Sequence, residues 1–149
     1  MKIPFYHQET CWTCGAATMR MALEYFGIKR SEKQVVKLLK TNKAHGSPHK
    51  NFSLVAEHFR INHTTMRNAK IRDIKDLISN NWVVIIGQFD TINNFGHYVV
   101  VNKVYGKFLY LNDPSLYKED KRNKITCKKF NSIWYDTEKE KGWLFALKK

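Results

Sequence analysis

The pattern of apolar residues changes once along this chain, at residues 80–81, and this change constrains the fold more than any other feature. Before it, apolar residues recur at three- and four-residue steps, the spacing of amphipathic helices. After it, β-branched and aromatic runs predominate, which is typical of strands. Helices that precede a sheet predict an α+β fold, with N-terminal helices packed on an antiparallel sheet. The length of 149 residues predicts a single domain over residues 1–149.

Four helices are expected in the first half. Gly27 is placed to end the first helix, and Ser31 with Gln34 forms the capping-box pattern that begins the second. Residues 42–50 contain Gly46 and Pro48 and are predicted to be a loop. A short strand is expected over residues 64–67. The predicted helices cover residues 14–26, a segment starting at residue 31, residues 52–59 and residues 71–78.

Three strands are expected to share a sheet in the second half. Gly106 suits a tight hairpin that joins the second strand to the third, with antiparallel pairing. Two further segments, 125–130 and 143–147, are expected to add edge strands, with a polar excursion over 136–141 between them. The three main strands cover residues 82–86, 98–104 and 108–111.

The charge balance favours acidic partners. The chain has 26 lysine and arginine residues against 13 acidic residues, a net charge of +13, which favours nucleic acid, anionic lipid or an acidic polymer. The lysines are spread along the chain, however, and there is no RNA-binding aromatic motif, zinc-finger spacing or glycine-rich phosphate loop. We therefore expect a lysine-rich solvated surface, and a basic nucleic-acid-binding module remains the alternative.

The N-terminus and the cysteines bear on the compartment. The first residues lack the apolar stretch of about 7–15 residues that a signal peptide requires, and the longest aliphatic run, over residues 82–86, is far shorter than the roughly 20 residues that cross a bilayer. Three cysteines cannot all pair internally. These observations predict a cytoplasmic protein without a membrane span.

Cys14 is the first candidate for chemistry, because an irregular segment is expected to turn into a helix there. The unpaired amides and the positive end of the helix dipole favour a thiolate, which is a nucleophile near neutral pH. The alternative is a small apolar cysteine of the core.

A thiolate nucleophile needs a base, and the base needs an orienting acceptor. His97 begins a strand after the flexible residues 93–96, and Asp113 ends the next strand. If these strands form the predicted hairpin, the two side chains lie at the same open end. The alternatives are a solvent-facing histidine and a turn-initiating aspartate before proline.

Other residues near Cys14 complete the candidate site. Gln8, six residues earlier, could donate together with the backbone N–H of Cys14 to an oxygen that becomes negative during attack on a carbonyl. Trp12 and Gly96 are expected to contact substrate, although packing of Trp12 against the first helix is the alternative.

Three motifs together resemble the peptidase domain of the bacteriocin-processing, double-glycine leader cysteine peptidases, a branch of the papain-like superfamily. The motifs are residues 8–17 (QETCWTCGAA), 96–101 (GHYVVV) and 112–114 (NDP), and the resemblance covers essentially the whole chain. It implies a papain-like fold, no metal or other cofactor, and thiol-dependent cleavage of a peptide or other amide bond. It also implies Cys14 as nucleophile, His97 as general base, Asp113 as the orienting residue and Gln8 in the oxyanion hole.

The substrate class stays open at this point. A leader peptide, a cell-wall cross-link peptide or a non-peptide amide would each suit such a hydrolase or a related acyl-transfer enzyme, and the positive charge favours an acidic substrate.

Cys11 leaves further alternatives. With Cys14 it makes a C-x-x-C pair, which suits either thiol–disulfide exchange or a disulfide that switches the nucleophile off. A zinc site is the other alternative, although the usual paired ligand spacing is absent, and we interpret His45 and His49 as loop polarity near the cleft. The ligands of such a zinc site would come from Cys11, Cys14 and Cys127 with His7, His45 or His49.

Overall fold

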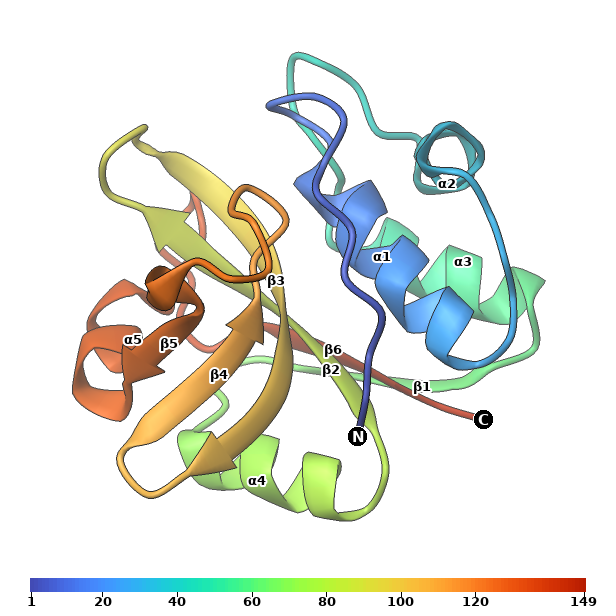
Figure 1. Cartoon of the computed structure of the whole chain (residues 1–149). Coiled ribbons are helices and arrows are strands. Elements are labelled where there is room, and N and C mark those ends of the chain that lie inside the picture. The colour runs from blue at the N-terminus through green and yellow to red at the C-terminus, as the bar shows by residue number, and fades with distance from the viewer.

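Six strands form one antiparallel sheet in the order β1-β6-β2-β3-β4-β5 in the computed structural model, which describes all 149 residues (Figure 1). The antiparallel sheet and the helices packed on it confirm the predicted α+β class. The strands are β1 (Asn62–Met66), β2 (Val83–Asp90), β3 (Phe95–Tyr105), β4 (Phe108–Asn112), β5 (Lys124–Thr126) and β6 (Leu144–Lys148).

The helices cover both faces of this sheet. The first three pack on one face, whereas α4 and α5 pack on the other (Figure 1). The helices are α1 (Cys14–Tyr25), α2 (Glu32–Leu39), α3 (Asn51–His58), α4 (Ile71–Ser79) and α5 (Cys127–Ile133), with a single 3₁₀ turn, η1 (Lys121–Asn123), before β5.

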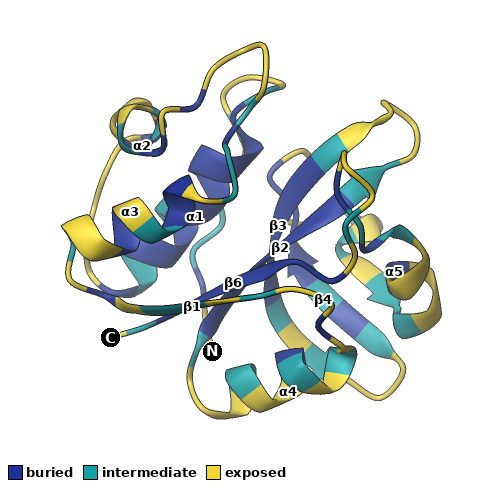
Figure 2. Cartoon of the chain, turned by 180° about the vertical axis from the view of Figure 1, so that it is seen from behind, coloured by how far each residue is buried: buried dark blue, intermediate teal, exposed yellow.

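The central strand β2 explains why the sheet is covered on both sides. Val83 and Ile85 belong to the core beneath α1, α2 and α3, and Val84 and Ile86 belong to the core beneath α4 and α5. Successive residues of a strand point to opposite faces, so a continuous apolar run needs cover on both. Figure 2 shows the resulting band of buried residues through the middle of the sheet.

Local signals in the first half behave as predicted. The N–H of Gly27 donates to the carbonyl of Glu24 at the end of α1, and Gly27 has φ +83°. Ser31 and Gln34 form the expected capping box at the start of α2. The predicted hairpin is also present, with Tyr105 paired to Phe108 around Gly106.

Two predictions for the C-terminal part are wrong. Residues 125–130 are not one strand: β5 ends at Thr126, whose side chain accepts the N–H of Lys129 and starts α5. Residues 143–147 do form a strand, β6, but not at an edge, because it lies between β1 and β2. Its complete burial on both faces over residues 144–147 fits that central place.

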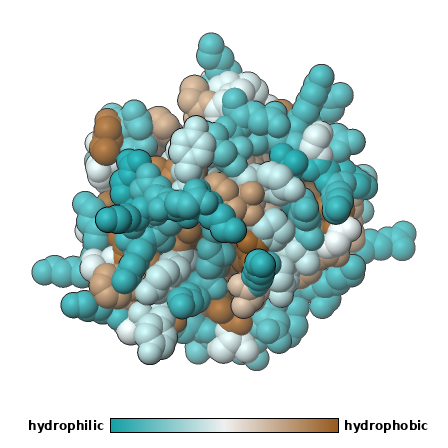
Figure 3. Space-filling view, viewed as in Figure 1, coloured by the Kyte–Doolittle hydropathy of each residue, from teal (hydrophilic) through white to brown (hydrophobic).

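The face of the molecule seen in Figure 1 is largely hydrophilic. Figure 3 shows hydrophilic groups spread over the face seen in Figure 1, with apolar groups between them. No helix of the chain combines the length and apolarity needed to cross a membrane.

The approach of β6 to the start of α4 yields a prediction about Gly142. Gly142 has φ +66°, and a Cβ atom there would lie 2.5 Å from the backbone nitrogen of Ala69. Gly142→Ala should therefore lower the free energy of unfolding by about 3 kcal/mol, measured in urea, because backbone must move as well as adopt an unfavourable φ. Gly106→Ala is the matched control: φ is +57° there but no atom lies within 4 Å of the added carbon, so the cost should be about 1 kcal/mol. Equal losses in the two variants would contradict this packing.

Candidate active site

A cleft of about 780 Å³ opens between the N-terminal end of α1 and the neighbouring ends of β2 and β3. The 43–50 loop forms one wall of this cleft, and the 136–140 loop contributes residues to another part of the lining. Cys14 and His97 both line the cleft, as do the predicted contact residues Trp12 and Gly96. Its remaining lining residues include Cys11, Arg67, Gly87, Gln88, Phe95 and Tyr98.

Cys14 is the first residue of α1 and is only 6% exposed. The preceding residue, Thr13, does not cap the helix with its side chain. The amides of the first helical turn have no partner within the helix, so they present partial positive charge at the position of the sulfur. Cys14 therefore lies, nearly buried, at the positive end of a helix dipole and in the lining of the cleft.

His97 and Asp113 meet at the end of the β3–β4 hairpin. The Nε2 atom of His97 lies 2.6 Å from the Oδ1 atom of Asp113, and the two residues are only 6% and 8% exposed. A carboxylate can only accept a hydrogen bond, so Nε2 carries a proton and donates it. The other ring nitrogen, Nδ1, is not engaged by Asp113, and Cys14 lines the same cleft as the ring.

The charge state of His97 follows from these two partners. Burial by itself would lower the pKa of His97, because it penalises the cation. Hydrogen bonds to Asp113 and Cys14, together with their charges, outweigh this effect and raise the pKa to about 10. The raised pKa favours the imidazolium form of the ring at neutral pH.

Asp113 is fixed by several contacts. Its Oδ1 atom also accepts the backbone N–H of Ser115 at 2.9 Å and the Ser115 hydroxyl at 2.7 Å. Burial would raise the pKa of Asp113, but the hydrogen bonds from His97 and Ser115 and the charge of His97 hold it below its usual value. Asp113 is therefore held as a carboxylate against the His97 ring.

Gln8 lies beside this turn but outside the cleft lining. Its backbone N–H donates to the carbonyl of Pro114 at 2.8 Å, and this bond ties the segment before α1 to the Asp113 turn. Its side-chain amide donates to the carbonyl of Thr10, also at 2.8 Å, while Oε1 is buried without a partner. The amide carries a second N–H besides the one that Thr10 accepts.

Gly96 shows why a glycine precedes His97. Its N–H donates to the Thr137 hydroxyl at 3.1 Å, and a Cβ atom at Gly96 would lie 2.9 Å from the same oxygen. A side chain would push the 136–140 loop away from the start of β3.

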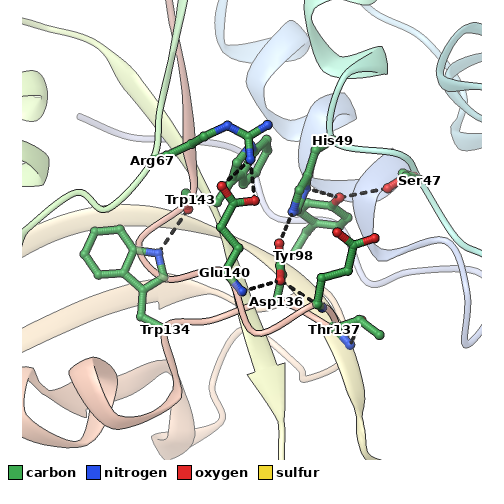
Figure 4. A network of polar contacts seen from close by, with 11 residues as sticks. Ser47, His49, Arg67, Tyr98, Trp134, Asp136, Thr137, Glu140 and Trp143 are labelled. Atoms are coloured by element: carbon green, nitrogen blue, oxygen red, sulfur yellow. Dashed lines mark hydrogen bonds and ion pairs between the residues drawn. The ribbon is translucent and has the colours of Figure 1, made fainter.

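The structure adds a polar network that the sequence did not reveal. His49 contacts both Asp136 and the Tyr98 hydroxyl, within the cleft (Figure 4). The prediction that His45 and His49 lie near the cleft is confirmed, since both line it. His49 and Asp136 are 87 residues apart, and neither belongs to a motif, so no sequence signal linked them.

The cysteines and histidines do not form a metal site. All three cysteines are free thiols, and no three His, Cys, Asp or Glu side chains are grouped so that they could hold a metal ion. Cys11 is exposed and lines the cleft with Cys14.

A comparison with protein families identifies the chain. The sequence profile described as "Peptidase_C39 like family" matches residues 1–141. The chain belongs to the C39-like peptidase family. No curated protein matches its sequence.

Solved structures share the fold of this C39-like peptidase. One described as a C39-like peptidase from Bacillus anthracis has a TM-score of 0.79 at 15% identity, over 99% of this chain and 95% of that one. A double glycine motif protease from an AMS/PCAT transporter, in complex with the leader peptide, has a TM-score of 0.76 at 24% identity. The match covers 99% of this chain and 93% of that one. The peptidase domain of Streptococcus ComA, a bifunctional ABC transporter, has a TM-score of 0.74 at 16% identity. The match covers 99% of this chain and 100% of that one. The fold is thus that of the papain-like C39 peptidases, and family and fold together support a cysteine peptidase.

The His97–Asp113 pair predicts how stability depends on pH. The pKa of His97 is raised from 6.5 to about 10, so its contribution to stability is complete below about pH 6.5 and is lost as the pH rises through about 10. Asp113→Asn should lower the free energy of unfolding by about 3 kcal/mol at pH 7, because it leaves a buried cation with one partner. The difference from wild type should shrink at pH 10.5, in urea titrations.

The control for this prediction is Asp120→Asn, the same substitution in the surface pair between Asp120 and Arg122, where asparagine keeps the Oδ1 acceptor that caps η1. It should not measurably change stability at either pH. A constant difference between wild type and Asp113→Asn across the two pH values would contradict the assigned charge on His97.

Proposed function

We propose that this C39-like peptidase is a thiol-dependent hydrolase that cleaves peptide bonds with Cys14, His97 and Asp113. The observation that carries the proposal is the 2.6 Å hydrogen bond from His97 Nε2 to Asp113 Oδ1 beside a buried Cys14 at the start of a helix. This arrangement leaves the opposite ring nitrogen for the thiol, which is the polarity that a Cys–His hydrolase needs.

Acyl transfer begins from an ion pair of the Cys14 thiolate and the His97 imidazolium. The Cys14 thiolate attacks the substrate carbonyl carbon, and the carbonyl oxygen becomes an oxyanion. The His97 imidazolium then protonates the leaving amine, which allows the C–N bond to break and leaves an acyl group on the sulfur. Asp113 keeps the ring oriented through both steps.

Hydrolysis completes the cycle. The now neutral His97 takes a proton from water, which attacks the thioester and releases the acid. The backbone N–H of Cys14 and the amide of Gln8 stabilise the oxyanion in each step. For Gln8 this requires its amide to turn towards the cleft, and catalytic hydrogen bonds are often completed only when substrate is bound.

The proposed substrate is a peptide that enters the cleft in an extended form. One similar structure is a double glycine motif protease with a leader peptide bound, so double-glycine leader peptides are the first substrates to test. Lys43 and Lys50 lie in one wall of the cleft and favour acidic residues of the substrate near them, whereas Glu138 and Glu140 elsewhere in the lining favour basic ones.

The test is cleavage of a peptide library that includes double-glycine sequences. Cys14→Ala and His97→Ala should each lower kcat/KM at least about a thousandfold, because each removes a reacting group. Asp113→Asn should have a smaller effect, and Gln8→Ala should lower kcat by about a hundredfold, with little change in KM, because it stabilises only the oxyanion. Mass spectrometry should detect the acyl group on Cys14.

Cys127→Ser is the matched control, since it replaces a free cysteine on α5 outside the cleft. It should cleave as wild type does. Full activity in Cys14→Ala would refute the mechanism.

A further inference from the structure

A second histidine joins two walls of the cleft. The Nε2 atom of His49, on the 43–50 loop, lies 3.1 Å from Asp136 Oδ2, on the 136–140 loop. Its Nδ1 atom lies 2.6 Å from the hydroxyl of Tyr98 on β3, and its ring stacks on Trp143 with 4.0 Å between ring centres. Figure 4 shows His49 between Tyr98 and Asp136. Three segments that are far apart in sequence therefore meet at one imidazole.

Asp136 organises the loop that it belongs to. Its Oδ1 atom accepts the backbone N–H groups of Glu138 at 2.9 Å and Glu140 at 2.8 Å, while its Oδ2 atom faces His49. Glu140 is also paired with Arg67, which follows β1 (Figure 4). That second pair is exposed and contributes little to holding the loop. The partly buried contact with His49 is thus the main tie between the 136–140 loop and the opposite wall.

The other end of the network reaches the nucleophile. The Tyr98 hydroxyl also lies 2.8 Å from the backbone carbonyl of Ser47, and its single proton goes either to that oxygen or to His49 Nδ1. Ser47 packs against Gly15, where an added Cβ atom would lie 2.6 Å from the Cβ of Ser47 and 3.2 Å from the Tyr98 ring. Gly15 directly follows Cys14. The wall that contains His49 is therefore packed against the residue next to the sulfur.

The contact between His49 and Asp136 does not depend on the charge of the ring. When His49 is neutral, Nε2–H donates to Asp136 and Nδ1 accepts the Tyr98 hydroxyl proton. When it is protonated, both nitrogens donate and the Tyr98 hydroxyl turns to Ser47. Burial lowers the pKa of His49 against the opposing effect of Asp136, which favours the neutral arrangement near pH 7.

We propose that His49 is a positioning residue for the substrate: through Asp136 it holds the two loops at the separation that a peptide needs, and it contributes to binding but not to bond cleavage. The inference rests on the proposed function, because it assumes that a peptide occupies the cleft. His49 acts by holding the loops that line the cleft, and it does not contact the reacting atoms.

Two alkylating probes separate binding from reactivity. Iodoacetamide reaches Cys14 without filling the cleft, whereas an acetyl-dipeptide chloromethyl ketone must occupy it. This probe is chosen from a panel of such chloromethyl ketones in which both residues of the dipeptide are varied. The one that alkylates the wild-type protein fastest is used for all variants. In His49→Ala the saturation constant KI of this probe should rise about tenfold, the effect of one lost hydrogen bond to a charged group. The limiting rate of alkylation and the iodoacetamide rate should stay unchanged.

Two variants keep the test specific. His49→Gln retains an N–H donor near the position of Nε2, so it should restore most of the wild-type KI if the contact with Asp136 is what matters. His58→Ala removes an exposed histidine at the end of α3, outside the cleft, and should leave KI unchanged. Circular dichroism at the same temperature checks that all variants are folded.

The outcomes are distinguishable. An unchanged KI in His49→Ala, or an equal slowing of both probes, would overturn the inference while leaving the proposed hydrolase intact. A wild-type protein whose Cys14 reacts with iodoacetamide, followed by mass spectrometry of the Cys14 peptide, but shows no saturation with any peptide probe would overturn the inference together with a peptide substrate. A wild-type Cys14 that reacts with neither probe would refute the proposed function itself.

Discussion

A positive charge buried between two acidic partners is the interaction on which this site depends. The ring of His97 is almost completely removed from water, and burial alone would keep it neutral. Only the combination of Asp113 on one nitrogen and Cys14 near the other makes the cation favourable. An unpaired buried charge is strongly destabilising, so the loss of a partner would destabilise the folded protein and lower the pKa of His97.

The fold brings these groups together by close backbone contacts. α1 presents Cys14 at its N-terminal end, and Gly15 allows that end to pack against Ser47 and Tyr98. The β3–β4 hairpin brings His97 to Asp113. The backbone bond from Gln8 to Pro114 then ties the segment before the helix to the turn that contains Asp113. Sheet and helix are held together at the site by main-chain contacts as well as by the reacting side chains.

The local part of this arrangement could be predicted from the sequence. Helical spacing, the capping box at Ser31 and the turn at Gly106 are properties of a few neighbouring residues, and the hairpin they imply brings His97 near Asp113. The place of β6 inside the sheet could not be predicted in this way, because strand order depends on packing between distant segments. The start of α5 was missed since Ile125 and Phe130 fit a strand, and only the cap at Thr126 favours a helix.

The polar network of the cleft could not be predicted from local sequence patterns. His49 is recognisable as a loop histidine, but its partner Asp136 lies on another loop and its second partner Tyr98 lies in a strand. Each residue has an ordinary local explanation. Their joint role emerges only when three segments converge, which depends on the assembled sheet. The same holds for the orientation of Gln8, whose amide faces Thr10 in this structure.

The most direct test of the account is the protonation of His97, observed by nitrogen-15 NMR of its imidazole in the substrate-free protein. The account predicts that both ring nitrogens carry protons at pH 7 and that the ring loses one only near pH 10. Cys14→Ala should shift this titration to lower pH, because one of the two partners is removed. A wild-type ring that is already neutral at pH 7 would contradict the claim that Cys14 and Asp113 hold a charged histidine between them.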